Sequence, residues 1–496
     1  MAKQQDTLSE LGNELFDSLG FNPTSNSTKP LYVANALFRA CTGIECKVED
    51  IHEWVLSERR SKATSSEAIL ESYKETVYIS GANAAEDVKE MRFFLEKLFN
   101  PDSTVYPSAP LSVMNIPSKW LVRSSMPAEA GIGTFLHDIL CTPIDGKPSK
   151  AIEVIETALM ADNDDLTRTV KPLIVRKPEA ERIKRSNPEH NDVEWNETKG
   201  TIRAGFDCLA RNCEEYSRNH GINTLLVLRR MVAYAMFSTF YYLEDVNRIA
   251  FSGDRIPLLL DADQHLGAIE CASESSFIAC KKAVESYTVS FIYAWLSRSS
   301  LIQNTNSQAS CEEYIRSGFS MTQKDENKGV RQVILQHISA HCQSGDAPLM
   351  ATAKALQFAL YTYKYPHTTP SDFCTVLGTK AGLVGPSGNA AKYKRFIINR
   401  FLLETIVLSV VDTDSLNDGI ELRELGTILR ECYSIIIGTD TDIDYELMDR
   451  FGIASATPED LRGELSENAR AIANMLISMG LAKRYADGVT IIGWGL

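Results

Sequence analysis

The middle of the chain carries apolar residues at helical spacing. One predicted helix presents an apolar face and ends at Gly221; that face is formed by Phe206, Leu209, Cys213 and Tyr216. Further on, steps of three and four residues make a seam by which one helix packs on another: Phe277, Cys280, Val284, Tyr287, Phe291 and Ala294. We therefore predict a helical core over residues 201–365.

Two helix starts of the same kind occur in the last third of the chain. Thr369-Pro-Ser-Asp372 and Thr457-Pro-Glu-Asp460 each place a threonine at the N-cap, a proline at the first helical position and an acid in the first turn. After the second start, a helix runs to Gly480, and LAKRYADGVTII follows as two short strands around an Asp-Gly turn. Because helix, turn, helix and hairpin is the order of a winged helix, we predict tandem winged-helix-like modules.

These patterns predict a mainly α-helical, multidomain protein. A chain of 496 residues has room for several cores. Its predicted parts are a mixed, mostly helical domain (1–165), a charged linker (166–200), the helical core (201–365) and the winged-helix-like region (366–496). The linker is predicted because RKPEAERIKRSNPEHNDVEWNETKG combines charge, two prolines and few apolar residues.

Composition favours a cytoplasmic protein without a membrane span. The start MAKQQDTLSELGNELF has no apolar signal-peptide core. The most apolar stretch, residues 222–242, has Arg229 and Arg230 at its centre, where each would cost about 3 kcal/mol in lipid. The eleven cysteines include no C-x-x-C, and an odd count argues against a disulfide framework.

The segment GLVGPSGNAAKYKRF, residues 382–396, superficially suggests a nucleotide phosphate loop. That loop needs a preceding buried strand and the spacing G-x-x-x-x-G-K-[ST]. Here Asn-Ala-Ala separates Gly388 from Lys392, and no serine or threonine follows the lysine. The spacing therefore excludes the usual phosphate loop.

The same segment reverses the sign of the charge. The chain has a net charge of −14, yet no acid lies between Asp372 and Glu404. This interval holds five cations, which are our candidate phosphate-contacting residues on double-stranded DNA: Lys380, Lys392, Lys394, Arg395 and Arg400. The alternative is a solvated turn whose cations pair with acidic segments nearby.

The second winged-helix-like module favours a protein partner instead. From Glu404 to the end the chain has 17 acidic and seven basic residues, which disfavours binding of a polyanion. Its predicted recognition helix presents Glu467, Asn468, Arg470 and Asn474, without a basic surround.

Candidate metal and catalytic motifs are weak. His337 and His341 lie one helical turn apart and could share a metal, and Cys342 follows them. The metalloprotease pattern H-E-x-x-H is absent, however. Two aspartate runs lack the glycine of a calcium loop: Asp440, Asp442 and Asp444, and Asp412, Asp414 and Asp418. Asp261 and Asp263 lack further support as a metal pair. We assign no catalytic residue, metal or cofactor.

Three segments carry a resemblance: GLVGPSGNAAKYKRFIINRFLLETIVLSVV, ELRELGTILRECYSIIIG and LRGELSENARAIANMLISMGLAKRYADGVTII. They loosely resemble the C-terminal part of poorly described bacterial proteins encoded among phage-defence and DNA modification–restriction genes. The resemblance implies a non-catalytic accessory subunit that works with a nuclease, ATPase or methyltransferase.

The leading hypothesis is a DNA-associated accessory or scaffold subunit of a bacterial defence assembly. One alternative is a hydrolase or nuclease with its active site in the first 370 residues, which carboxylates or histidines converging in one cleft would favour. The other is a protein-interaction scaffold that does not bind nucleic acid.

Overall fold

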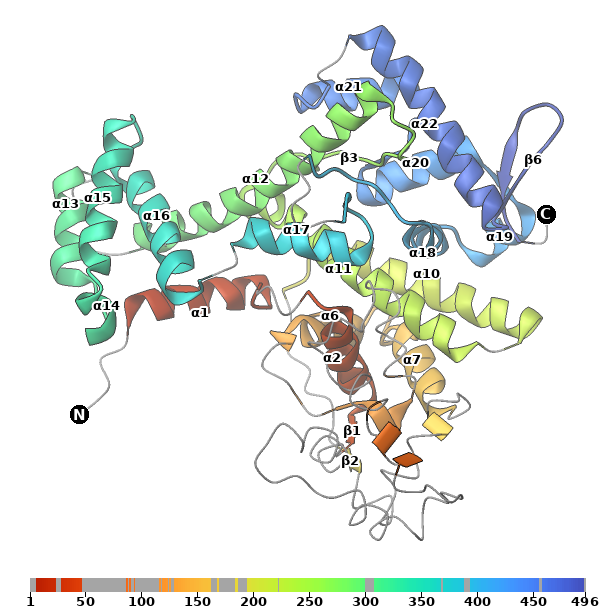
Figure 1. Ribbon diagram of the computed structural model, residues 1–496, viewed down its shortest axis with the longest axis horizontal. Coiled ribbons are helices and arrows are strands. Elements are labelled where there is room, and N and C mark those ends of the chain that lie inside the picture. Colours follow the sequence, from red (N-terminus) through yellow and green to blue (C-terminus); the bar gives the residue numbers. More distant parts are fainter. Residues whose placement is uncertain are drawn as a thin grey trace.

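The computed structural model is mainly helical (Figure 1). It describes residues 6–23, 28–46, 129–161, 194–221, 223–298, 307–366, 369–387, 393–454 and 457–494, with a few shorter pieces between residues 86 and 185. The helices before residue 300 are α1 (Thr7–Leu19), α2 (Pro30–Thr42), the 3-10 turn η3 (Lys119–Leu121), α6 (Ile132–Cys141), α7 (Lys150–Met160), α10 (Glu197–His220), α11 (Thr224–Phe251) and α12 (Gly267–Ser297).

The later helices are α13 (Gln308–Glu313), α14 (Gln323–Asn327), α15 (Val330–Gln343), α16 (Pro348–Ala359), α17 (Pro370–Ala381), α18 (Arg400–Val410), α19 (Thr413–Asp418), α20 (Leu422–Tyr433), α21 (Thr441–Arg450) and α22 (Pro458–Ser478), with π-helical turns η5 (Tyr314–Gly318) and η6 (Leu360–Lys364). The short strands are β1 (Ile44–Cys46), β2 (Ile183–Arg185), β3 (Leu258–Leu259), β4 (Ile420–Glu421), β5 (Ile435–Ile436), β6 (Ala482–Arg484) and β7 (Thr490–Ile492).

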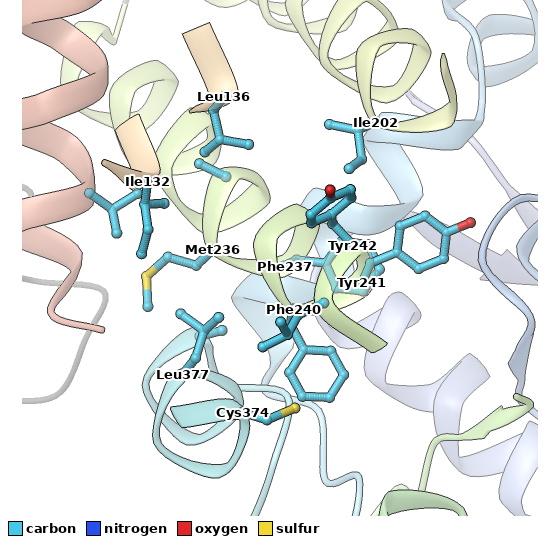
Figure 2. Packing of buried hydrophobic residues seen from close by; sticks show 14 of the residues in the cluster. Ile132, Leu136, Ile202, Met236, Phe237, Phe240, Tyr241, Tyr242, Cys374 and Leu377 are labelled. Carbon is cyan, nitrogen blue, oxygen red and sulfur yellow. The ribbon is translucent and has the colours of Figure 1, made fainter. Parts of the chain in front are cut away.

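The core is built around α11, which is covered on most sides. Its neighbours include α2, α7, α10, α12, α17 and α18. Phe237, Phe240 and Tyr241 are fully buried, and Figure 2 shows them among side chains of the surrounding helices. A helix that is apolar on nearly all sides is the expected centre of a large helical core.

The two arginines of α11 are placed by α18. Arg230 forms an ion pair with Glu404, and the Arg229 guanidinium lies 4.5 Å from the ring centroid of Phe401. Both arginines, which would be costly in lipid, therefore contact side chains of a neighbouring helix. No helix in the described residues is long and apolar enough to span a bilayer.

Helix α12 connects two ends of the molecule (Figure 1). At one end it packs against α16 of the α13–α16 bundle, and at the other against α22. The predicted seam lies on this helix: Phe277, Cys280, Val284 and Tyr287 are buried, whereas Phe291 and Ala294 are half-buried. The predicted helix end at Gly221 is also confirmed, because α10 ends at His220.

The N-terminal helix lies against the α13–α16 bundle and α12. The Thr7 amide donates to the Ser320 carbonyl at 3.0 Å, and Lys364 pairs with both Asp6 and Asp325. In contrast, α2, α6 and α7 pack together below α10 and α11. Within the predicted linker, most residues from 169 to 193 lie outside the described residues, and α10 begins at Glu197.

Both predicted Thr-Pro helix starts are confirmed, at α17 and α22. The predicted terminal hairpin is also present, with Ala482 opposite Ile492, and β4 completes a three-stranded sheet in the order β4-β7-β6. After α17 the chain differs: Gly385 bridges Arg395, and Ile397 then forms a parallel bridge with Asp261. The segment around Arg395 therefore pairs with Gly385 and with Asp261 just after β3, instead of forming a hairpin of two strands like that after α22.

Glu244 of α11 is a buried carboxyl group. Its side chain is 2% exposed, and among the described residues its Oε1 atom has no hydrogen-bond partner. The Cys280 thiol lies 3.9 Å from Oε2. Desolvation, followed by the charge of Asp245, raises the pKa of Glu244 well above its ordinary value.

We expect Glu244→Gln to remove a pH dependence of stability. Above the ordinary carboxyl pKa the unfolded chain releases this proton while the folded chain retains it. The group therefore lowers stability as pH rises, by up to about 1.4 kcal/mol per pH unit. Denaturant unfolding of wild type and variant between pH 5 and 8 measures this, with the exposed Glu285→Gln as control. Equal slopes for wild type and Glu244→Gln would contradict the assignment.

Candidate functional site

Among the five predicted cations, the four that the structure describes do not form one solvent-facing group. Lys380 is half-buried on α17, and its ammonium donates to the Thr28 hydroxyl at 3.0 Å. Burial, aided by the charge of Lys29, lowers the pKa of Lys380. Lys394 donates to the Pro386 carbonyl at 2.6 Å, and Arg400 is exposed at the first position of α18. Lys392 lies outside the described residues.

Arg395 is directed into the protein. The residue is 8% exposed; its Nε lies 2.6 Å from Asp261, and its Nη2 lies 2.7 Å from Glu270 and 3.1 Å from Asp263. Burial alone would lower the pKa of Arg395, but the hydrogen bond to Asp261 and the three carboxylate charges raise it overall. For Arg395 the contacts therefore match the alternative in which a cation of this interval pairs with acidic segments nearby, and they disfavour phosphate contact.

The three carboxylates around Arg395 come from one loop and the helix that follows it. β3 pairs in parallel with β5, and the chain then continues to Asp261, whose amide donates to the Phe396 carbonyl at 2.8 Å. Asp261 has no exposed surface. The loop ends at α12, which supplies Glu270 in its first turn. We call Asp261, Asp263, Glu270 and Arg395 the Arg395 cluster.

The backbone of this loop is held in an uncommon conformation. Asp263 and His265 have φ angles of 57° and 58°, a region that residues other than glycine seldom adopt. Such angles persist only where the surroundings fix them. Here the Asp263 amide donates to the Asp261 Oδ1 at 2.7 Å, and Glu464 of α22 accepts from the Ala268 amide at 2.7 Å.

Asn468 of α22 also holds the loop from within. Its Oδ1 accepts from the Ala262 amide at 2.9 Å, and its Nδ2 donates to the Leu260 carbonyl at 2.8 Å and the Ile437 carbonyl at 3.2 Å. The side chain is completely buried. Asn468 is therefore not presented on the surface of the predicted recognition helix, whereas Glu467, Arg470 and Asn474 are exposed.

Beside Arg395, three side chains bring together possible metal ligands. One ligand atom each from Asp263, His265 and Glu270 lies within 4.8 Å of the others. His265 is 86% exposed at its side chain and lies 3.5 Å from Glu270. An imidazole and two carboxylates form a donor set suited to a divalent transition metal, although Arg395 already contacts both carboxylates.

Several side chains of the other candidate metal groups form local contacts instead. His337 stacks on Phe358 with a ring-centroid separation of 4.0 Å, and His341 Nδ1 lies 3.1 Å from Asp346. In the aspartate run before α21, Asp440 is the helix N-cap, Asp442 pairs with Arg462 and Asp444 pairs with Arg430. Asp412 is the N-cap of α19.

Comparison with protein families, with curated proteins and with solved structures finds no match for this chain. The Arg395 cluster is therefore interpreted from its own geometry. Its contacts join three segments, because Arg395 and Asp261 are 134 positions apart and Asn468 lies 208 positions after Leu260.

We expect Arg395→Met to destabilise the protein. The variant leaves the buried Asp261 carboxylate without its cation, and breaking one side of a buried ion pair costs about 3–5 kcal/mol in proteins. Denaturant unfolding would measure the loss. Arg400→Met is the matched control, because Arg400 is exposed and its removal should change stability by no more than about 0.5 kcal/mol.

The double variant Arg395→Met/Asp261→Asn should recover part of the stability, since it also removes the uncompensated charge. If Arg395→Met and Arg400→Met are equally stable, the ion pair between Arg395 and Asp261 does not stabilise the fold.

Proposed function

We propose that this chain is a non-catalytic accessory or scaffold subunit of a bacterial defence assembly, and that its C-terminal winged-helix-like module docks a protein partner. Support for the module comes from its elements, which follow in the order β4, α20, β5, α21, α22, β6 and β7, and from the sheet order β4-β7-β6. In a winged helix, the last long helix and the hairpin form the binding surface. The link to defence assemblies rests on the resemblance of the three segments quoted above.

The observation that carries the choice of a protein partner is the charge on the outer face of α22. Its exposed residues include three acids, Glu459, Asp460 and Glu467, against one cation, Arg470. A face with this balance repels phosphate and complements a basic protein surface. The hairpin carries the opposite charge, because Lys483 and Arg484 of β6 are exposed, so the acidic balance belongs to α22 and not to the hairpin.

Within this proposal, DNA binds at the segment from Tyr393 to Arg400, which we call the edge around Tyr393. That side chain is 70% exposed, is followed by Lys394, and precedes the exposed Arg400. An exposed aromatic ring beside cations is suited to base stacking and phosphate contact. Arg395 has no part in it, because its guanidinium is held by the Arg395 cluster.

Co-purification from the native cell distinguishes the two kinds of partner. We expect a protein to remain bound in stoichiometric amount after nuclease treatment, and to be lost from the charge-swap variant Glu459→Lys/Glu467→Lys. Glu285→Lys is the control, because it places the same change on an exposed position of α12. Retention of the partner by the Glu459→Lys/Glu467→Lys variant would refute docking on this face.

A salt-titrated DNA-binding assay tests the proposed DNA contact by comparing wild type with Lys394→Gln/Arg400→Gln. Loss of two phosphate contacts should reduce the slope of log affinity against log salt by about 2. Identical slopes would exclude this edge as a DNA contact.

A second candidate function, metal-dependent hydrolysis, is favoured by the convergence of Asp263, His265 and Glu270. Calorimetric titration with Mn²⁺ tests it. If the site is real, Asp263→Asn should weaken binding by about tenfold or more, because it removes an anionic ligand. Asp254→Asn, on an exposed position outside the cluster, should bind as wild type does. Absence of Mn²⁺ binding by the wild type would eliminate this function.

A further inference from the structure

A cavity of about 770 Å³ lies where five helices meet, away from the Arg395 cluster. Its walls come from the C-terminal end of α1, from α6, from the start of α10, and from α11 and α12. This volume falls within the range of pockets that hold small organic ligands. Sequence analysis does not predict this cavity, because its key polar residue, Lys199, lies in the segment predicted as a charged linker.

One side of the cavity is aromatic. Phe21, Phe135 and Tyr242 form a cluster, with ring centroids 4.7 Å apart for Phe135 and Tyr242 and 5.3 Å apart for Phe21 and Phe135. Tyr287 lines another wall, where its hydroxyl contacts the Ser18 hydroxyl at 2.5 Å. A flat apolar ring is the shape that such walls accommodate.

Lys199 brings a cation to this aromatic wall. The residue is 7% exposed, and its Nζ lies 5.9 Å from the Phe135 centroid and 5.7 Å from the Tyr242 centroid. Its ammonium has three N–H groups, but within the described part of the chain it has one hydrogen-bond acceptor, the Glu194 carbonyl at 2.8 Å. Burial lowers the pKa of Lys199. An ammonium with so few partners is stabilised by an added anion.

Two further polar groups of the described residues belong to the lining. Tyr242 is only 3% exposed and lines the cavity, so its hydroxyl is a possible hydrogen-bond donor to a ligand there. The Oδ1 atom of Asn22 is buried and unpaired within the same described part. Unpaired buried polar groups are uncommon in proteins and need an explanation. The Asn22 Oδ1 atom accepts hydrogen bonds, so a donor such as water would satisfy it, whereas a ligand carboxylate would accept from Lys199 and Tyr242.

Acidic residues in the lining limit the charge of that ligand. Asp17 and Glu194 are exposed, where solvent screens their charge, whereas Asp138 is buried. A second negative charge on the ligand would face these carboxylates. A cationic ligand would instead compete with Lys199 for the same aromatic faces.

We propose that this cavity binds a small organic monoanion of the aromatic carboxylate class. The carboxylate accepts hydrogen bonds from Lys199 and the Tyr242 hydroxyl, and the ring packs against Phe135 and Tyr242. This inference is independent of the scaffold function, since it concerns neither α22 nor the edge around Tyr393.

Ligand-observed NMR titration of the full chain with four probes tests the proposal: benzoate, its neutral analogue benzamide, benzylamine and inorganic phosphate. We expect benzoate to bind at least about tenfold more tightly than the other three, a difference of about 1.4 kcal/mol. Lys199→Met should weaken benzoate binding by a similar factor. The exposed Lys282→Met on α12 should leave it unchanged.

Tyr242→Phe provides a second variant if Lys199→Met does not fold, because it removes the hydroxyl and retains the ring. It should weaken benzoate about fivefold, the effect of one hydrogen bond, without altering the weaker affinity for benzylamine. The proposal is overturned if benzoate does not saturate the wild type, if benzamide or benzylamine binds as tightly, or if all variants bind benzoate equally.

Discussion

The ion pair between Arg395 and Asp261 is the contact on which the arrangement of the C-terminal half depends. Asp261 is fully buried, and a buried carboxylate requires a cation and hydrogen bonds to offset its desolvation. Arg395 supplies both and extends to Asp263 and Glu270. The pair thereby fixes the segment after α17 to the end of β3 and to the first turn of α12.

The same region joins the C-terminal helix to the helical core. Asn468 satisfies backbone groups on both sides of the β3–β5 pair, and Glu464 accepts from the first turn of α12. Helix α12 continues from this contact to the α13–α16 bundle, so one helix packs against both α22 and α16 (Figure 1). The exposed face of α22 lies opposite the side chains that make these contacts.

Charged residues inside this protein serve packing more than chemistry. Arg230 pairs with Glu404 across α11 and α18, and Asp245 accepts from Arg248 at 2.6 Å and from Thr198. Glu244 lies in the same layer with an elevated pKa, as its burial requires. Lys199 differs from these groups, because it borders a cavity and lacks a carboxylate partner among the described residues.

The sequence by itself determined the local structure. The spacing of apolar residues identified the mainly helical character and the seam on α12, while the Thr-Pro starts located α17 and α22, because caps and amphipathic faces depend on residues within a few positions. It also located the terminal hairpin. Only the tertiary structure decided which side chains of the basic interval are exposed, and that Asn468 is buried. Whether a cation faces solvent or a carboxylate depends on partners more than a hundred positions away, such as Asp261 for Arg395, and no local pattern records that distance. The cavity beside Lys199 likewise exists only where five separate helices meet.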